Sequence, residues 1–337
     1  MQRISYFDFL RGVAIIMVCA IHCFGICYSK SNVSIPSIVV RNLMNIAVPL
    51  FFAISGYFLA SKKMENGGYA KFLKRQVPRV YVPVLFCSLV YLFQDIVNGV
   101  YVEAIVSFFF CGYSIYYFIS VIIQCYLLLP VFNRNLTVSC ILTLFVISVA
   151  WWALNIYFVG MFLKMSLPLE IYAGNFIPWS VFFVLGMSFS KYGGLCDCVT
   201  LKSLFFFAAI LCVLSVVESI YIIDSRGTLN GVGQKPSSVC LNFVLCIIAL
   251  HGNTRRFFSL CKKNVFYDFI CLLGRFSFGI YLIHFFTLKM AWKIESFLLC
   301  PSIKWIVCTM LVLPVSMVPL MVWKKIFPRM SKILLGV

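Results

Sequence analysis

The sequence predicts an all-α protein that crosses a membrane about ten times. The chain of 337 residues is 63% hydrophobic and only 11% charged, and its mean hydropathy is +1.01. Soluble domains carry about 25% charged residues, so this composition excludes an ordinary soluble domain. Apolar segments of about 20 residues, the length that spans a bilayer as a helix, recur along the whole chain.

These segments define the expected helices in order. The windows are 7–28, 38–60, 80–98, 114–132, 138–159, 176–192, 202–222, 238–251, 270–290 and 303–323. The first window contains charged residues and has no small-residue cleavage site after it, so we expect it to stay in the protein rather than act as a signal peptide. Residues 101–112 are apolar but too short to span, which predicts an interfacial or re-entrant helix.

The distribution of basic residues predicts that both termini are cytoplasmic. If the N-terminus is cytoplasmic, 20 of the 28 Lys and Arg residues fall on that side, as the positive-inside rule requires. The net charge of +18 then mainly reflects this topology, and it attracts the protein to anionic lipid. Because the longest hydrophilic loops are only 61–79 and 252–269, we expect residues 1–337 to form one integral domain, with no soluble appendage and no nucleic-acid partner.

Most of the 16 cysteines lie within the expected spans, where a thiol behaves as a small hydrophobic group. Cys196 and Cys198 form a C-x-C pair in a cytoplasmic loop. A metal site would need two further ligands, and none is evident nearby. We therefore expect no metal.

Arg11 and His22 are the strongest indication of function, because both lie in the apolar segment FDFLRGVAIIMVCAIHC. Eleven steps of 100° bring the two side chains to one helix face, about 16 Å apart along the axis. Ionisable groups in a bilayer are costly and usually face a bundle interior or a wet cavity. Asp8 lies three residues before Arg11 and offers it a local partner, so a structural ion pair and a shared functional site both remain open for Arg11.

The ninth window carries a second polar face. In GRFSFGIYLIHF, Ser277, Tyr281 and His284 recur at helical spacing and share one face. His284 lies about 15 Å into the membrane, a depth similar to that of His22. Two of the three histidines are therefore expected at one level, on helices that can meet. Hydrogen bonds to neighbouring helices are the alternative role for Ser277 and Tyr281.

Several motifs, which follow one another along most of the chain, resemble those of the membrane-bound acyltransferase 3 family. The family's first span carries an Arg, ten residues and then a His, as Arg11 and His22 do here. The other similar segments are VPLFF (48–52), SGYFLA (55–60), YYFISVIIQCYLLLPVF (116–132), FFVLGM (182–187) and SFGIYLIHF (277–285). Two departures are that Arg75 and Arg79 stand where Arg-x2-Arg is common, with three residues between them, and that YYF stands where a Trp is common.

The resemblance implies transfer of an acyl group, usually acetyl, from acyl-coenzyme A to a hydroxyl group of a glycan, sugar or lipid in a bacterial plasma membrane. His22 is the expected general base, because an unperturbed imidazole titrates near neutrality. Arg11, His284 and Tyr281 are the other candidate catalytic residues. We expect Ser55 with Gly56 to serve close helix packing rather than act as a nucleophile.

Coenzyme A is an anionic head on a thin pantetheine arm, so it needs cations at the cytoplasmic mouth. Arg79, Arg75, Lys74 and Arg11 are the candidate ligands for its phosphates, since guanidinium groups bind phosphate in a bidentate manner. The roughly 16 Å between Arg11 and His22 is comparable with the reach of the arm. We therefore expect the thioester to reach His22 along the Arg11 face of the helix.

Two other functions are compatible with a basic multispanning protein. A glycan or lipid transporter or flippase would use buried Arg11, His22 and His284 for substrate or protons, but the inverted repeats of many transporters are not evident. A glycan polymerase or ligase should carry a large outer loop, whereas the outer loops here are short. Dependence on coenzyme A would distinguish the acyltransferase from both.

Overall fold

Every regular element in the described part of the chain is helical. The computed structural model describes residues 5–60, 68–193, 199–229, 232–260, 264–292 and 300–337. The elements are α1 (Ser5–Cys27), α2 (Ile35–Met44), α3 (Ala47–Ala60), α4 (Gly68–Val97), α5 (Val102–Phe109), η1 (Ser114–Tyr116), α6 (Tyr117–Arg134), α7 (Val138–Ala153), η2 (Leu154–Phe162), α8 (Leu169–Tyr172), α9 (Ser180–Tyr192), α10 (Leu201–Arg226), α11 (Pro236–Leu250), α12 (Gly252–Leu260), α13 (Val265–Trp292), α14 (Pro301–Ile326) and α15 (Pro328–Leu334). The prediction of an all-α fold is confirmed.

Eight helical segments in these ranges are long and apolar enough to cross a membrane, and α11 with α12, bent by 55°, would make a ninth. The expected count of ten is not reached, because the window 176–192 contains only the 13-residue helix α9. A helix of that length covers about 20 Å, less than the roughly 30 Å of a hydrocarbon core. Most residues of α9 are buried inside the protein, so this apolar run forms a core helix.

A glutamine on α6 bonds to the non-helical chain before α9. The side-chain amide of Gln124 on α6 donates to the Gly174 carbonyl (2.8 Å) and accepts from the Phe176 backbone N–H (2.9 Å). Buried backbone groups must be satisfied inside a membrane protein. Gln124 therefore satisfies two backbone groups of residues 173–179, which are non-helical within the bundle.

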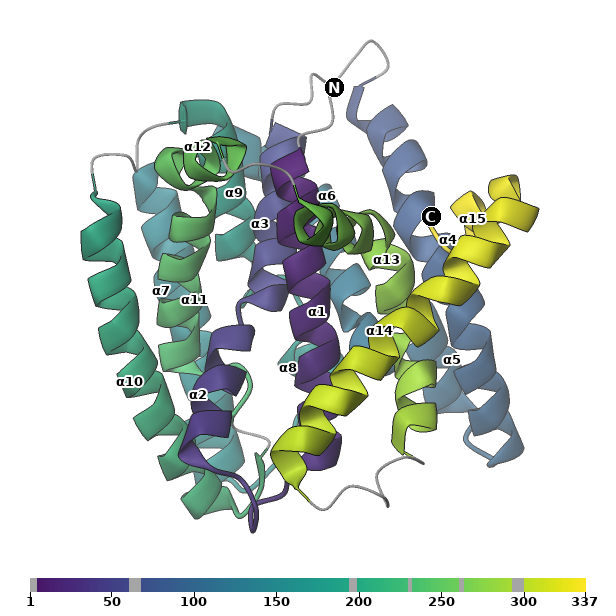
Figure 1. Ribbon diagram of the computed structural model, residues 1–337, viewed down its shortest axis with the longest axis horizontal. Helices are drawn as coiled ribbons and strands as arrows, with labels where there is room; N and C mark the ends of the chain where they lie inside the picture. The colour runs from purple at the N-terminus through teal and green to yellow at the C-terminus, as the bar shows by residue number, and fades with distance from the viewer. Residues whose placement is uncertain (1–4, 61–67, 194–198, 230–231, 261–263, 293–299) are drawn as a thin grey trace.

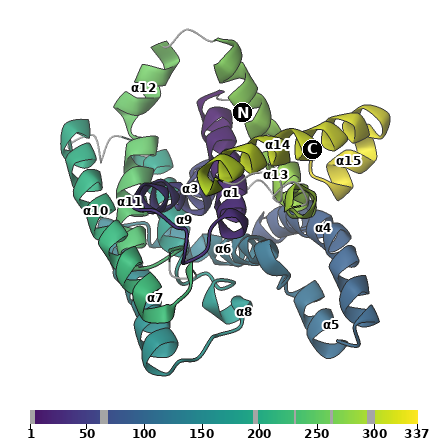
Figure 2. The same cartoon turned by 60° about the horizontal axis from the view of Figure 1, so that its bottom comes forward.

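α1 lies at the centre of the bundle and contacts α3, α13 and α14 (Figures 1 and 2). The α1–α13 contact is very close, because it is made at Gly12 and Gly274. A Cβ at Gly12 would lie 2.0 Å from the Ile270 carbonyl oxygen, and one at Gly274 would lie 1.8 Å from the Asp8 carbonyl oxygen. Small residues let helix backbones approach in this way within membranes. The contact fixes the helix that carries His22 against the helix that carries His284.

A second close contact joins α3 to α9. A Cβ at Gly56 would lie 1.9 Å from the Phe183 carbonyl oxygen, and one at Gly186 would lie 1.8 Å from the Ala53 carbonyl oxygen. Of the Ser55–Gly56 pair, Gly56 thus serves the expected close helix packing, whereas Ser55 lines the central cavity described below.

A buried polar network joins α2 to the segment that precedes α11. Lys235 is fully buried, and its ammonium group donates to Asn42 Oδ1 (2.9 Å) and Ser238 Oγ (3.0 Å). The Asn45 side chain donates to the carbonyl oxygens of Val232 (3.1 Å) and Gly233 (3.0 Å). A buried charge is tolerated only when it is hydrogen-bonded, and these bonds hold residues 232–235 against α2.

The segment 101–112 contains the expected short helix, α5, which packs on α4. Residues 61–67 lie outside the described chain, but the basic end of the 61–79 loop forms the first turns of α4 rather than a loop. α1 and α4 begin in the same half of the molecule as α15, at the C-terminus (Figure 1). That this half faces the cytoplasm stays a prediction.

Candidate active site

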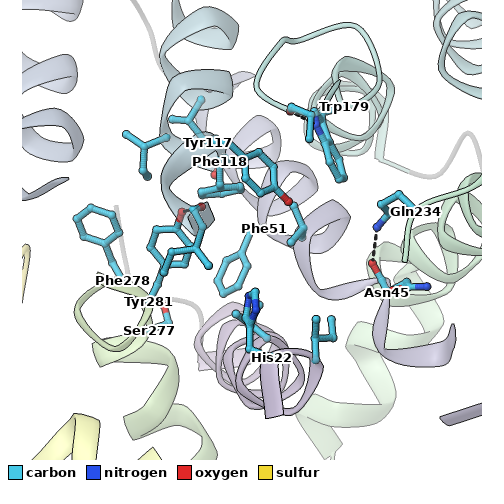
Figure 3. Close-up of a pocket in the computed structure, with 18 of the residues that line it drawn as sticks. His22, Asn45, Phe51, Tyr117, Phe118, Trp179, Gln234, Ser277, Phe278 and Tyr281 are labelled. Atoms are coloured by element: carbon cyan, nitrogen blue, oxygen red, sulfur yellow. Dashed lines mark hydrogen bonds between the residues drawn. The ribbon is translucent and has the colours of Figure 1, made fainter. Parts of the chain in front are cut away.

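A central cavity of about 560 Å³ runs through the bundle beside α1. Arg11 and His22 both line it, so the prediction that their side chains share one face of the helix is confirmed. Its remaining walls come from α2, α3, α6, α9, α13 and the segments before α9 and α11. Figure 3 shows the His22 ring directed into this space, with Phe51, Tyr117 and Tyr281 around it. An imidazole and a guanidinium thus face one cavity about 16 Å apart along α1.

The rings of His22 and His284 lie side by side, with 5.3 Å between their centroids and 45° between their planes. His284 is fully buried and lies behind the cavity wall. Its Nδ1 is 2.8 Å from the Tyr281 carbonyl oxygen and 3.2 Å from that of Ile280. Because a carbonyl only accepts, the proton of the neutral ring belongs on Nδ1, which leaves Nε2 as an acceptor. No described residue bonds to that Nε2, so this buried nitrogen is left as an acceptor beside the His22 ring.

Arg11 makes the expected local ion pair and also faces the cavity. Its guanidinium lies 3.7 Å from the Asp8 carboxylate and 5.2 Å from the centroid of the Phe58 ring. The Arg11 side chain nevertheless keeps one third of its surface exposed. The structural and the functional interpretations are therefore compatible, because the pair orients the guanidinium at the edge of the cavity.

Tyr281 and Ser277 line the cavity on α13, as their shared face predicts. The Tyr281 hydroxyl donates to the carbonyl oxygen of Ile115, on the segment before α6. Tyr116 ties the same two segments in the opposite direction, since its hydroxyl donates to the Leu282 carbonyl oxygen at 2.8 Å. The Tyr281 proton is thus engaged with backbone, while its ring forms part of the cavity wall.

Replacing Tyr281 by phenylalanine is expected to lower stability more than turnover. The change would leave the Ile115 carbonyl without this donor, which costs about 1–3 kcal/mol in a buried site, while the ring would still fill the wall. Thermal unfolding in detergent and the rate per folded molecule measure the two effects separately. A drop in rate of more than about 100-fold in a normally folded variant, the scale of lost acid–base catalysis, would instead assign the hydroxyl to the chemistry.

The predicted phosphate ligands Lys74, Arg75 and Arg79 lie on the first turns of α4 and are exposed. None of them lines the central cavity, whereas Val80, next to Arg79, does. Tyr126, another lining residue, is close enough to both Arg11 and Arg79 for direct electrostatic interaction. Arg79 therefore lies near the end of the cavity where Arg11 is found. Lys74 and Arg75 lie nearer the N-terminus of α4.

The opposite end of the cavity has polar and aromatic walls that the sequence analysis did not single out. The Gln234 side chain donates to the Asn45 carbonyl oxygen (3.2 Å), as Figure 3 shows, and accepts from Asn242 (3.3 Å). Trp179 and Tyr117 face it across the space (Figure 3). These residues come from four separate segments, so no local sequence motif predicts that they meet.

Two cations in the cavity wall were also missed as site residues. Arg41 on α2 and Arg275 on α13 both line the cavity. Arg41 falls inside the predicted window 38–60, so the rule that singled out Arg11, an ionisable side chain within an apolar span, applies to it as well. Arg275 directly follows Gly274, at the N-terminal end of the motif in the ninth window. The C-x-C pair, Cys196 and Cys198, lies outside the described residues.

Comparison with known proteins gives one match. The model of the acyltransferase 3 family, described as an acyltransferase domain, matches residues 4–321. No curated protein and no solved structure matches the chain significantly. The matched range contains every residue that lines the central cavity.

Proposed function

The chain belongs to the acyltransferase 3 family, and we propose that it is an O-acyltransferase that moves an acyl group, most simply acetyl, from acyl-coenzyme A to a hydroxyl group of a cell-surface glycan or lipid-linked sugar. The family and the apolar helices support a multi-pass membrane acyltransferase. The donor, the acceptor and a bacterial plasma membrane as the location are parts of the proposal.

One observation carries this proposal: a single cavity contains a cation at one end and a paired imidazole further in. Arg11 and His22 lie on one face of α1 and both line the cavity. Coenzyme A needs cations for its phosphates and a narrow route for its arm. The distance of about 16 Å along α1 is comparable with the reach of that arm, so a donor held near Arg11 presents its thioester to His22.

The reaction needs a base that works near neutral pH. In the proposed step His22 takes the proton from the acceptor hydroxyl while the oxygen attacks the thioester carbonyl carbon. The carbon–sulfur bond then breaks, and the same proton passes from the imidazolium to the leaving thiolate. The products are an ester and free coenzyme A, so atoms and charges balance. His284 contributes as a positioning residue, because its buried ring fixes the side of His22 that faces α13.

The acceptor enters from the end of the cavity opposite Arg11. Trp179 and Tyr117 offer apolar ring faces there, and Asn45 and Gln234 lie beside them. A flat apolar face next to a few polar groups is a common way to orient a small polar ligand. This composition suits a sugar, which has hydroxyl groups at its edge and C–H groups on its faces.

Changing Arg11 to lysine is expected to lower the affinity for coenzyme A by about tenfold while the protein yield stays normal. Lysine keeps the charge that pairs with Asp8 but loses the bidentate geometry for a phosphate. Arg134, an exposed residue of α6 outside the cavity, provides the matched control Arg134→Lys. Unchanged affinity with a reduced yield would mean that Arg11 acts only as the partner of Asp8.

The first test of the function is release of the coenzyme A thiol from acetyl-coenzyme A by the purified protein in lipid, with a membrane glycan extract as acceptor. Release that requires both protein and extract is the expected result. Coenzyme A binding, measured separately, distinguishes a poor acceptor from a wrong donor. If the protein neither binds coenzyme A nor releases thiol, the proposal fails and substrate transport through the same cavity becomes the better explanation.

A further inference from the structure

We propose that the acceptor is an anionic molecule, and that Arg41 holds its negative charge at the end of the cavity opposite Arg11. This inference rests on the proposed function, since it concerns the second substrate of the same site. The anion is a carboxylate or a phosphate carried by the hydroxyl-bearing molecule.

Arg41 is a cation that has no acidic partner in the described chain. Its guanidinium donates to Asn45 Oδ1 and lies 5.9 Å from the centroid of the Phe24 ring. No described carboxylate lies within 4.0 Å of it, whereas Arg11 has Asp8 at 3.7 Å. An arginine offers five N–H donors, and intramembrane arginines normally find a partner. A ligand with negative charge would supply the partner that the protein does not.

Arg41 also stands where two cavities meet. A second cavity of about 360 Å³ is lined by Ile21 and Arg41, which line the central cavity too, and by the exposed turn at Ser29 and Lys30. The two cavities therefore adjoin at Ile21 and Arg41. In this proposal the acceptor follows a path from the turn through the second cavity into the central one, past the Arg41 guanidinium.

The charge along this path has one sign. Among the described residues that line the two cavities, the charged ones are Arg11, Arg41, Arg275 and Lys30, and none is an Asp or Glu. A cleft with low-dielectric walls and charges of one sign concentrates ligands of the opposite sign. The donor accounts for the cations at the Arg11 end, but Arg41 and Lys30 lie at the other end and need a different anion.

The position of Arg41 relative to His22 decides which substrate that anion belongs to. The two side chains are close enough for direct electrostatic interaction, and both face the central cavity. A ligand whose anionic group contacts Arg41 would therefore place a neighbouring hydroxyl close to the imidazole. Trp179 and Gln234 complete the wall on that side, so an acidic sugar or a sugar phosphate fits the chemistry of the site.

The test compares three small acceptors with the protein in lipid nanodiscs. Methyl glucoside is neutral, methyl glucuronide carries a carboxylate, and glucose 1-phosphate carries a phosphate. Binding of each is measured by calorimetry without donor, and the KM of each is measured by thiol release from acetyl-coenzyme A. We expect the wild type to bind one or both anions about 10–100-fold more tightly than the neutral glucoside, the scale of a charge-assisted hydrogen bond. The preferred anion distinguishes a carboxylate from a phosphate source.

Two variants assign the preference to Arg41. Arg41→Gln is expected to abolish it, and Arg41→Lys to retain part of it, since lysine keeps the charge but not the planar fork. Lys164→Gln is the matched control, because it also removes one positive charge, on the exposed segment after η2, and Lys164 lines neither cavity. The control should keep the preference. Coenzyme A affinity should be unchanged in all three variants, which shows that they are folded.

The outcomes separate this inference from the function on which it rests. Equal binding of all three acceptors by the wild type would overturn it. A similar loss of rate with neutral and anionic acceptors in Arg41→Gln would overturn it too, since Arg41 would then stabilise the reacting carbonyl rather than the acceptor's charge. If no acceptor supports thiol release and coenzyme A does not bind, but anion binding still requires Arg41, the anion site stands and the acyltransferase proposal fails.

Discussion

Replacing His22 by alanine is expected to lower the rate of acyl transfer by about 10²–10⁴-fold, the usual contribution of a general base. His22 is the imidazole that lines the cavity, so a hydroxyl bound there would lose its nearest proton acceptor. The affinity for coenzyme A should change little, because the proposed phosphate ligands lie about 16 Å away along α1. The measurement is thiol release at saturating donor, with binding of coenzyme A followed separately.

The control for His22→Ala is His251→Ala. His251 is equally a histidine of this bundle and is fully buried, but it caps α11, with its Nδ1 3.1 Å from the Asn253 backbone N–H, and does not line the cavity. A normal rate per folded molecule in this control would show that the loss is specific to the site. If His22→Ala kept wild-type turnover in a folded protein, the base would have to be another group, although the reaction class would stand.

The second large effect is expected at the crossing of α1 and α13. In Gly274→Ala the new methyl group would lie 1.8 Å from the Asp8 carbonyl oxygen, so the helices must separate. Overpacking typically costs about 1–3 kcal/mol and occasionally more. Here the new methyl group meets a backbone carbonyl, which cannot move aside as a side chain can by changing its rotamer. We expect a loss at or above the upper end of that range, seen as a thermal unfolding midpoint lower by roughly 5 °C or more.

The same change should also reduce activity in the molecules that remain folded, because α1 carries His22 and α13 carries His284. Gly25→Ala provides the matched control on α1, since a Cβ at Gly25 has no atom within 4 Å. A methyl group there adds helix propensity without a clash, so stability should be kept or slightly raised. Equal unfolding midpoints for Gly274→Ala, Gly25→Ala and the wild type would show that this crossing relaxes freely.

Local helical geometry was enough to predict the centre of the site. The common face of Arg11 and His22 depends only on the helical repeat, and the structure places both in one cavity. Their positions in the two spans predicted that His22 and His284 lie at one level on helices that can meet, and the rings are 5.3 Å apart. Sequence alone gave no reason to choose α13 as the neighbour of α1, because the close approach depends on Gly12 meeting Gly274 across 262 residues.

The features that sequence reasoning missed have two causes. Some depend on contacts between segments far apart in the chain, and others depend on whether an apolar segment is surrounded by protein or by lipid. Gln234 reaches the cavity through its bond to Asn45, 189 residues away, and such a partner has no local signal. Hydropathy predicts a span at window 176–192, because a hydrophobic run has the same hydropathy in a protein core as in lipid. α9 is in fact buried among other helices. The exposed positions of Lys74 and Arg75 likewise depend on where α4 begins.

Because one helix carries both Arg11 and His22, the distance between the two side chains along the axis and the angle between them around it are fixed. Since each residue adds about 1.5 Å and 100°, an inserted residue between them would turn His22 out of the cavity, and only steps of three or four would return it to the same side at a different depth. For the proposed donor, the part of the molecule that binds at Arg11 and the part that reacts at His22 must therefore be separated by one set length. A shorter thioester would reach the imidazole without also contacting the guanidinium.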